Sequence, residues 1–304
     1  MGYRYRKGDE KRVDLVDPAY VESIAGFFLK VGRTYFRTTI QGLKYIPRKG
    51  PALIVANHGV LAIESPFLMA EIWKGTRRVV RSLADHFLWS IPLLRDRLIK
   101  AGVVDGDRDT AVRLLKSGEM ALVYPEGAKG AAKPYDRKYE LDWTGRYGFI
   151  KVALLANAPI IPVVIVGADD TYWVVNDPYK WARLILRSES MPLPLPIGLG
   201  LLPFPAKLSI RIGPPIRLGY GPEAARNERI VEKLQKQVWR TVKDMLERGL
   251  AERAGKATAP EPKAAPAARA PSPTSPSAPS RAGTAAPRRR RSPAGSCAHA
   301  RRRR

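Results

Sequence analysis

Short, uninterrupted apolar runs alternate along this chain with stretches whose apolar residues recur every three or four positions. The runs predict buried strands, at residues 51–56, 77–83, 101–104, 120–124, 159–167 and 207–212. The second pattern predicts helices, at residues 20–39, 65–74, 107–116, 148–157 and 222–250. Ser65, placed before Pro66, is expected to cap the helix that it opens. Strands that alternate with helices predict an α/β fold, with a mixed, largely parallel sheet flanked by helices.

Composition divides the chain into three parts. Residues 1–20 are charged and form a basic N-terminal segment, and residues 21–250 hold all of the predicted elements. Residues 251–304 consist mainly of Ala, Pro, Ser and Arg and hold no large apolar side chain. Such a segment cannot bury enough apolar surface to fold, so we expect a disordered basic tail after a single folded domain.

The charge balance favours an anionic partner. The chain has a net charge of +25, and its last 54 residues hold 13 of the 53 Lys and Arg and two of the 28 acidic residues, so the first 250 carry +14. A basic surface attracts nucleic acid, anionic lipid headgroups or phosphorylated substrates, and charge alone does not choose among them. The arginine runs 288–291 and 301–304 are compatible with a membrane, with nucleic acid, or with no specific partner.

Several segments are candidates for membrane contact, although no run of about 18 apolar residues predicts a spanning helix. Residues 191–205 hold seven Leu, Ile and Phe residues and no charge, which is typical of a loop that dips into a bilayer or of a buried connection. Residues 88–94 offer a second apolar face, and residues 20–39 predict an amphipathic helix that packs on the core or lies on a membrane. The N-terminus lacks the apolar core of a secretory signal, so we expect a peripheral protein on the cytoplasmic side of a membrane.

Two polar motifs follow predicted buried strands. Asn57-His58-Gly59 ends the first strand, with Glu64 six positions after His58, and Glu126-Gly127 ends the fourth. Ligands of open α/β sheets gather at the carboxyl ends of strands, so the two motifs face one cleft if these strands are neighbours. A histidine held by a carboxylate is the usual general base.

Covalent and metal-dependent mechanisms lack their residues in this sequence. No Gly-x-Ser-x-Gly motif is present, and the single cysteine, Cys297, lies in the tail, which disfavours an acyl-enzyme and an internal disulfide. The sequence offers no cluster with metal-ligand spacing, so no metal is expected. A histidine base therefore has to activate a hydroxyl of the substrate or a water molecule.

The ordered motifs resemble those of the glycerophospholipid acyltransferase family. Asn57-His58 with Glu64, then Tyr124-Pro125-Glu126-Gly127, then residues 158–164 carry the resemblance, which covers about residues 35–215. It implies that a lipid hydroxyl attacks the thioester of acyl-CoA or of an acyl-carrier protein, and that no further cofactor is needed. The acceptor that it implies is a glycerolipid or a lysophospholipid.

The resemblance also assigns roles to individual residues. It makes His58 the base and Glu64 its partner, and it places the remaining candidates in substrate binding: Asn57, Gly59, Arg108, Glu126, Gly127 and Lys129. Arg108 and Lys129 would bind an acceptor phosphate.

Two departures from the family pattern bear on the acceptor. In the usual family pattern, four residues separate the His from an Asp. Here Ile63 occupies the position of that Asp, and Glu64 follows it. A longer gap is similar to that of the diacylglycerol acyltransferase-like branch. Lys129 stands where Arg is common, and a lysine binds phosphate as a point charge and not as a bidentate fork. These departures make lysophosphatidate a less favoured acceptor.

Structural alternatives stay open for most of these residues. Glu64 could act only on a helix N-terminus, Glu126 could be a turn residue, and Arg108 could be a surface residue. Lys129 could belong to a solvated basic loop together with Lys133, Arg137 and Lys138. His86, beside Asp85, is more typical of a structural histidine.

Three other functions remain possible at this point: a nucleic-acid-binding protein, a catalytically silent lipid-binding module, and a thioesterase. The sequence disfavours the first, because it contains no helix-turn-helix, zinc-finger or aromatic RNA-binding pattern. The sequence does not predict the oligomeric state.

Overall fold

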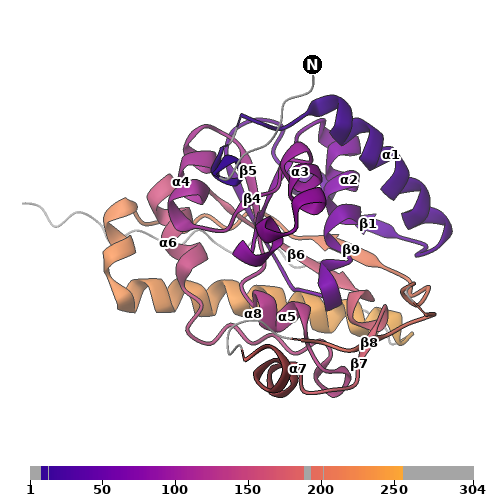
Figure 1. Cartoon of the computed structure of the whole chain (residues 1–304). Coiled ribbons are helices and arrows are strands. Elements are labelled where there is room, and N and C mark those ends of the chain that lie inside the picture. Colours follow the sequence, from indigo (N-terminus) through magenta and orange to yellow (C-terminus); the bar gives the residue numbers. More distant parts are fainter. Residues whose placement is uncertain (1–7, 13, 188–192, 201, 256–304) are drawn as a thin grey trace, which may run out of the picture. The chain divides into compact units, whose positions relative to one another are not determined.

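A seven-stranded, largely parallel sheet forms the centre of the computed structural model, which describes residues 8–12, 14–187, 193–200 and 202–255. The strand order is β1-β9-β6-β2-β5-β3-β4, and β9 runs antiparallel to β6 (Figure 1). The predicted α/β class and the mixed, largely parallel sheet are confirmed. The tail predicted to be disordered lies outside the described residues from residue 256 onward.

The six predicted strands are all present, and three short ones were not predicted. The strands are β1 Thr39–Gln41, β2 Ala52–Ala56, β3 Val80–Ala84, β4 Val104–Asp105, β5 Met120–Val123, β6 Ile160–Val166, β7 Trp173–Val174, β8 Pro196–Ile197 and β9 Ser209–Ile212. Strands β7 and β8 pair with each other in a separate two-stranded ribbon.

The helices are α1 Pro18–Thr34, α2 Ser65–Thr76, α3 Pro92–Lys100, α4 Arg108–Lys116, α5 Ala128–Ala131, α6 Gly148–Ala156, α7 Pro178–Trp181 and α8 Glu228–Arg253. Shorter helical turns include η3 Val60–Ala62, η4 His86–Ser90 and the π-helical turn η7 Ala182–Leu186. Helix α1 ends five residues before the predicted boundary because the chain then enters β1. The end of α8 extends three residues beyond the predicted domain boundary at 250.

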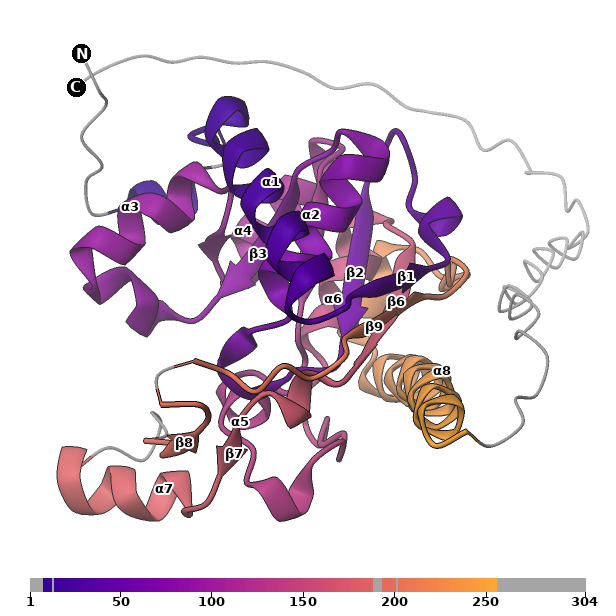
Figure 2. The same cartoon turned by 90° about the vertical axis from the view of Figure 1, so that its right-hand side faces the viewer.

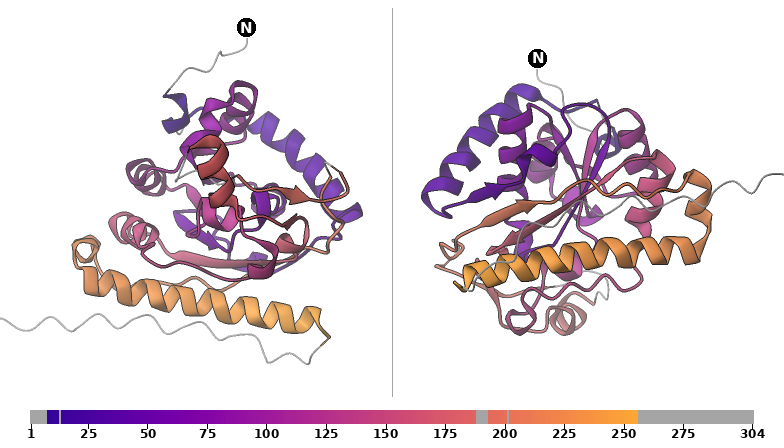
Figure 3. Two further views of the ribbon diagram at one scale, coloured as in Figure 1. Left: turned by 60° about the horizontal axis from the view of Figure 1, so that its bottom comes forward. Right: turned by 180° about the vertical axis from the view of Figure 1, so that it is seen from behind.

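Helices cover both faces of the sheet, and the strands alternate accordingly. In β2, Leu53 and Val55 pack into the core beneath α4, α6 and α8, whereas Ile54 packs into the opposite core beneath α1 and α2. Figure 2 shows α8 on one side of the sheet and α1 with α2 on the other, and Figure 3 shows α8 from below and from behind. A strand buried on both faces reads as a continuous apolar run, which explains why β2, β5 and β6 were predictable.

Helix α2 begins differently from the prediction. Glu64, and not Ser65, occupies the N-cap position, and the Glu64 side chain makes no capping bond. The Ser65 hydroxyl instead hydrogen-bonds the Tyr124 hydroxyl at 2.8 Å. The predicted serine cap is therefore wrong, because a tertiary contact takes the hydroxyl that the sequence assigned to the helix terminus.

Candidate active site

His58 and Glu64 form a buried pair at the carboxyl end of β2. The Nδ1 atom of His58 lies 2.9 Å from Oε1 of Glu64, and Glu64 is fully buried. When Nδ1–H donates to the carboxylate, the lone pair is on Nε2, the atom from which a general base acts. The geometry therefore provides an imidazole of fixed tautomer with a carboxylate that stabilises its protonated form.

A strained turn brings Glu64 back to His58 across six residues. Leu61 and Ala62, within η3, both have left-handed backbone conformations, with φ of 56° and 57°. Such a conformation costs about 1–2 kcal/mol per non-glycine residue. The longer spacing between histidine and carboxylate is thus accommodated by two consecutive left-handed residues.

Gly59 is required by the close packing of this turn. A Cβ at Gly59 would lie 2.4 Å from Cβ of Ala168 and 2.8 Å from Oε2 of Glu64. The residue predicted to contact substrate therefore allows the Glu64 carboxylate to approach the imidazole, which a larger side chain would prevent.

Glu126 contacts the main chain of the base. Strands β2 and β5 are parallel neighbours, as the predicted shared cleft requires. Oε2 of Glu126 accepts a hydrogen bond of 2.9 Å from the backbone N–H of His58, and Glu126 is buried. The structure thus brings His58 and Glu126 together, with Glu126 in a position to orient the histidine.

Lys133 neutralises this buried carboxylate, together with a second one. Its Nζ lies 3.2 Å from Oε1 of Glu126 and 3.4 Å from Oδ2 of Asp169, and 3.5 Å from the carbonyl oxygen of His58. Desolvation lowers the pKa of Lys133, but the carboxylates of Asp169 and Glu126 outweigh it, and the net pKa is raised. Lys133 consequently stays charged, and the view of it as part of a solvated loop is wrong.

Tyr124 packs directly on the base. Its ring stacks on the His58 imidazole with 4.1 Å between ring centroids and 13° between ring planes. Burial and the nearby Glu64 carboxylate raise the pKa of the Tyr124 phenol well above its usual value, so the hydroxyl remains neutral. The stacking and the hydrogen bond to Ser65 fix both the plane and the position of the imidazole.

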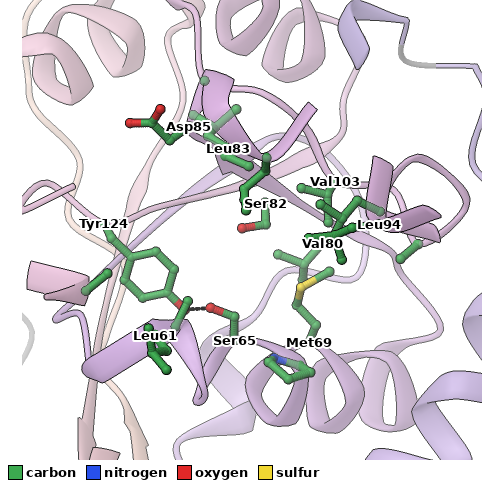
Figure 4. A pocket seen from close by; sticks show the side chains of 18 of the residues that line it. Leu61, Ser65, Met69, Val80, Ser82, Leu83, Asp85, Leu94, Val103 and Tyr124 are labelled. Atoms are coloured by element: carbon green, nitrogen blue, oxygen red, sulfur yellow. Dashed lines mark hydrogen bonds between the residues drawn. The ribbon is translucent and has the colours of Figure 1, made fainter. Parts of the chain in front are cut away.

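A largely apolar cavity of about 1000 Å³ opens beside His58. It lies between α1, α2, β3, β5 and the segment that carries η4 and α3. In Figure 4, Tyr124, Leu61 and Ser65 stand at one end of the cavity, and Leu94 and Val103 stand at the other. A cavity of this volume and composition accommodates a long apolar ligand next to the imidazole.

The remaining predicted substrate-binding residues separate into three groups. Gly127 lines the cavity. The Asn57 side chain accepts a hydrogen bond from the backbone N–H of Ile165 and donates one to the carbonyl of Ile165, which links β2 to β6; its contact with substrate stays a prediction. Arg108 and Lys129 are exposed and are not among the described residues that line the cavity, so their phosphate role stays a prediction.

Sequence reasoning did not assign functional positions to Lys133, Asp169, Tyr124 or Ser65. Lys133 pairs with Glu126 seven positions away, but each of the four residues also contacts a residue at least 30 positions away in the chain, which a local pattern does not indicate. Tyr124 opens the motif Tyr124-Pro125-Glu126-Gly127 and therefore shares its place at the end of β5, but the motif gave it no role of its own.

His86 forms a second histidine–carboxylate contact at the cavity, but not with its neighbour Asp85. Its Nδ1 lies 2.9 Å from Oδ1 of the buried Asp105, and the histidine side chain is 75% exposed. The main chain of β4 brings Asp105 beside β3, which the sequence did not indicate. An exposed imidazole of this kind fits the structural role expected for His86.

Comparison with known proteins adds independent information. A family model described as Acyltransferase matches residues 37–166. An uncharacterised protein of Mycobacterium tuberculosis is 35% identical over 246 residues, which span 77% of this chain and 67% of that protein. The human "DGAT1/2-independent enzyme synthesizing storage lipids" is 30% identical over 201 residues, which span 66% of this chain and 59% of that enzyme.

A solved structure also resembles the chain. The crystal structure of the 1-acyl-sn-glycerophosphate acyltransferase PlsC from Thermotoga maritima is similar over 75% of this chain and 78% of that chain, with 20% sequence identity and a TM-score of 0.49. The range that the family model matches contains Asn57-His58, Glu64 and Glu126-Gly127. The chain therefore belongs to the glycerophospholipid acyltransferase family and is an O-acyltransferase.

Proposed function

We propose that this protein transfers a fatty acyl group from the thioester of acyl-CoA or acyl-carrier protein to a hydroxyl of a glycerolipid or lysophospholipid, with His58 as general base. One observation carries the proposal: the His58–Glu64 pair, 2.9 Å apart, stands beside an apolar cavity of about 1000 Å³. The cavity suits the acyl chain, and the imidazole suits the removal of a proton from the acceptor.

The proposed reaction needs no covalent enzyme intermediate. Nε2 of His58 takes the proton of the acceptor hydroxyl while its oxygen forms a bond to the thioester carbonyl carbon. The tetrahedral intermediate then collapses, the carbon–sulfur bond breaks, and the departing thiolate receives the proton from the imidazolium. Glu64 stabilises the imidazolium between these two steps.

The placement of the cations supports an uncharged acceptor. Arg108 and Lys129, which the resemblance assigns to phosphate binding, are not among the described residues around the cavity, and the ammonium of Lys133 is bound by two carboxylates. The human relative is named for the synthesis of storage lipids. A neutral acylglycerol therefore fits this site better than lysophosphatidate does. If lysophosphatidate were the acceptor, Arg97, which lines the cavity, would be the cation that binds its phosphate.

An assay of the full chain with radiolabelled acyl-CoA tests these points. Three acceptors are compared: a neutral monoacylglycerol, a neutral diacylglycerol and lysophosphatidate. We expect labelled product that depends on the acceptor, with the neutral acceptors preferred. Release of free fatty acid at full rate without acceptor would identify a thioesterase instead. Preference for lysophosphatidate, lost on Arg97→Gln, would overturn the choice of acceptor.

Glu64→Gln should lower kcat by about 10²-fold, because the amide cannot stabilise the imidazolium as a carboxylate does. KM should change little, since Glu64 contacts the base and not the substrate. Steady-state kinetics measure both, and circular dichroism confirms the fold. Glu64→Asp keeps the carboxylate but moves it about one methylene away from Nδ1 of His58. Its kcat should therefore lie between those of wild type and Glu64→Gln. An Asp variant as impaired as the Gln variant would show that the charge of the carboxylate does not determine kcat.

Val103→Phe should shorten the acyl chain that the protein accepts. Val103 stands across the cavity from Tyr124, so a larger side chain occupies space near the predicted methyl end of a long chain (Figure 4). We expect kcat/KM to fall about tenfold for long-chain thioesters and to stay unchanged for short ones. This fall corresponds to a loss of about one to two kcal/mol of free energy from apolar burial of the chain. Val103→Ala, which enlarges the same region, should shift the preference toward longer chains. An equal loss for all chain lengths would place the acyl group elsewhere.

A further inference from the structure

Two separate segments expose large apolar side chains on the side of the fold where α3 and α7 project. The first segment is η4 with α3, where Phe87, Ile91 and Leu93 are exposed, Leu93 to 75%. The second is η7 with the β7–β8 ribbon, where Leu184, Ile185 and Ile197 are exposed, Leu184 to 75%. Figure 2 shows both segments projecting on the same side, to the left, with α8 on the other side of the sheet. We refer to these six side chains as the apolar rim.

The two segments that carry the apolar rim contribute side chains to the cavity that opens beside His58, Phe87 of the rim among them. Leu88 and Leu94 of the first segment line that cavity, and so do Leu193 and Pro194, which lead into β8. Each segment thus turns some apolar side chains into the cavity and others outward. A ligand that leaves the cavity between the two segments meets apolar surface on both sides.

The Asn176 side chain pairs two main-chain groups of the second segment. The Asn176 side chain donates to the carbonyl of Leu193 and accepts from the N–H of Leu195. Trp173 packs between Tyr135 and Phe204, with ring centroids 5.2 Å and 5.0 Å apart, which holds the ribbon on the fold. The pairing of these two main-chain groups lowers the cost of placing this part of the segment in an apolar medium.

Positive charge accompanies the apolar rim. With their N-cap residues included, residues 177–187 carry Lys180, Arg183 and Arg187 against the single Asp177, and residues 85–100 carry Arg95, Arg97 and Lys100 against Asp85 and Asp96. The three cations of the α7–η7 segment are exposed. Apolar side chains flanked by cations on one face are typical of a surface that inserts into an anionic bilayer, and the exposed indole of Trp181 suits the headgroup region.

We propose that the apolar rim inserts into an anionic bilayer and places the mouth of the cavity against it, so that the acceptor lipid reaches His58 without crossing water. The inference rests on the proposed function, since it identifies where that reaction takes place. A bilayer is favoured over a protein partner because the two segments frame an apolar cavity for lipid-sized ligands and carry a positive charge complementary to anionic headgroups.

Vesicle flotation of the full chain tests the proposal. Vesicles of phosphatidylcholine alone are compared with an equimolar mixture of phosphatidylcholine and phosphatidylglycerol, and we expect binding to the mixture at least tenfold stronger. The double variant Leu184→Asp/Ile185→Asp should reduce binding to the mixture about tenfold or more, because it removes apolar area and adds two negative charges. Leu93→Asp, on the other segment, should reduce binding by a smaller factor.

Lys233→Gln/Arg240→Gln is the matched control. Both residues are exposed on α8, on the other side of the sheet, and the change lowers the net charge by the same two units. Its binding should remain close to wild type. Equal losses in the control and in the Leu184/Ile185 variant would reduce the effect to net charge and overturn the apolar rim as the contact surface. A wild-type dimer in lipid-free solution that the Leu184/Ile185 variant dissociates would identify the occupant as a second copy of the chain.

Activity separates this inference from the proposed function. The Leu184/Ile185 variant should lose turnover of an acceptor embedded in vesicles in proportion to its loss of binding, and should keep wild-type turnover of a short-chain, water-soluble acceptor. Wild-type protein that binds vesicles but transfers no acyl group to either acceptor would sink the proposed function and leave the surface standing. Acyl transfer to the soluble acceptor without vesicle binding would do the reverse.

Discussion

His58→Ala is expected to lower kcat for acyl transfer by about 10³–10⁴-fold, which is the usual contribution of a positioned general base together with its carboxylate partner. The effect should fall on kcat, because the imidazole acts on the proton that moves as the acyl bond forms. Steady-state kinetics with labelled acyl-CoA and a neutral acylglycerol measure it. Near-normal turnover by a folded variant would remove the proposed mechanism.

The control for this variant follows from the burial of Glu64. Removal of the imidazole leaves a fully buried carboxylate without its partner, and an unpaired buried charge is destabilising. Lost activity in His58→Ala could therefore reflect lost structure. His58→Asn provides an amide that can donate to Glu64 but cannot act as a base, so it should be as inactive as His58→Ala and more stable to heat.

Lys133→Met should be the most destabilising of these substitutions, by about 3–5 kcal/mol, because it leaves Glu126 and Asp169 buried without their shared cation. For a domain of this size, such a loss corresponds to a fall in Tm of about 10 °C. Thermal unfolding followed by circular dichroism measures it. Turnover at temperatures where the variant is folded should also fall, since Glu126 holds the backbone N–H of His58.

The pH dependence of this destabilisation distinguishes a charge effect from a packing effect. Burial raises the pKa of Glu126 and of Asp169, and loss of the Lys133 cation raises both further. Between the ordinary pKa values of these carboxyl groups in the unfolded chain and their raised pKa values in the folded variant, the folded variant keeps protons that the unfolded chain has released. Its stability relative to wild type therefore falls as pH rises through this range. We expect a smaller deficit at a pH of about 5 than at about 8.

Lys138→Met is the matched control for Lys133→Met. Lys138 pairs with Asp170 at 3.4 Å but is exposed, and surface pairs contribute at most about 1 kcal/mol. Its Tm should stay within a few degrees of wild type. A deficit equal to that of Lys133→Met, or one independent of pH, would contradict the view of Lys133 as the counter-ion of two buried carboxylates.

Local patterns determined much of the fold. The continuous apolar runs of β2, β5 and β6 were readable because a strand covered on both faces needs apolar side chains at every position. The helix at residues 108–116 was readable from its acidic cap Asp107, which accepts a hydrogen bond from the backbone N–H of Thr110. Helix α3 was missed because its residues look like an apolar surface patch, and their helical spacing is interrupted by Arg95, Asp96 and Arg97.

The sequence by itself determined the α/β class, the family, and the motif residues His58, Glu64 and Glu126, because strand ends and polar motifs are local features. Only the tertiary structure decided what these residues contact. Because β2 and β5 are neighbours, Glu126 contacts the backbone of His58. Two consecutive left-handed residues bring Glu64 back to the imidazole, and the conformation of the loop after α5 buries Lys133 between two carboxylates. Charge and burial at such a site depend on residues far apart in the chain, and no local pattern encodes them.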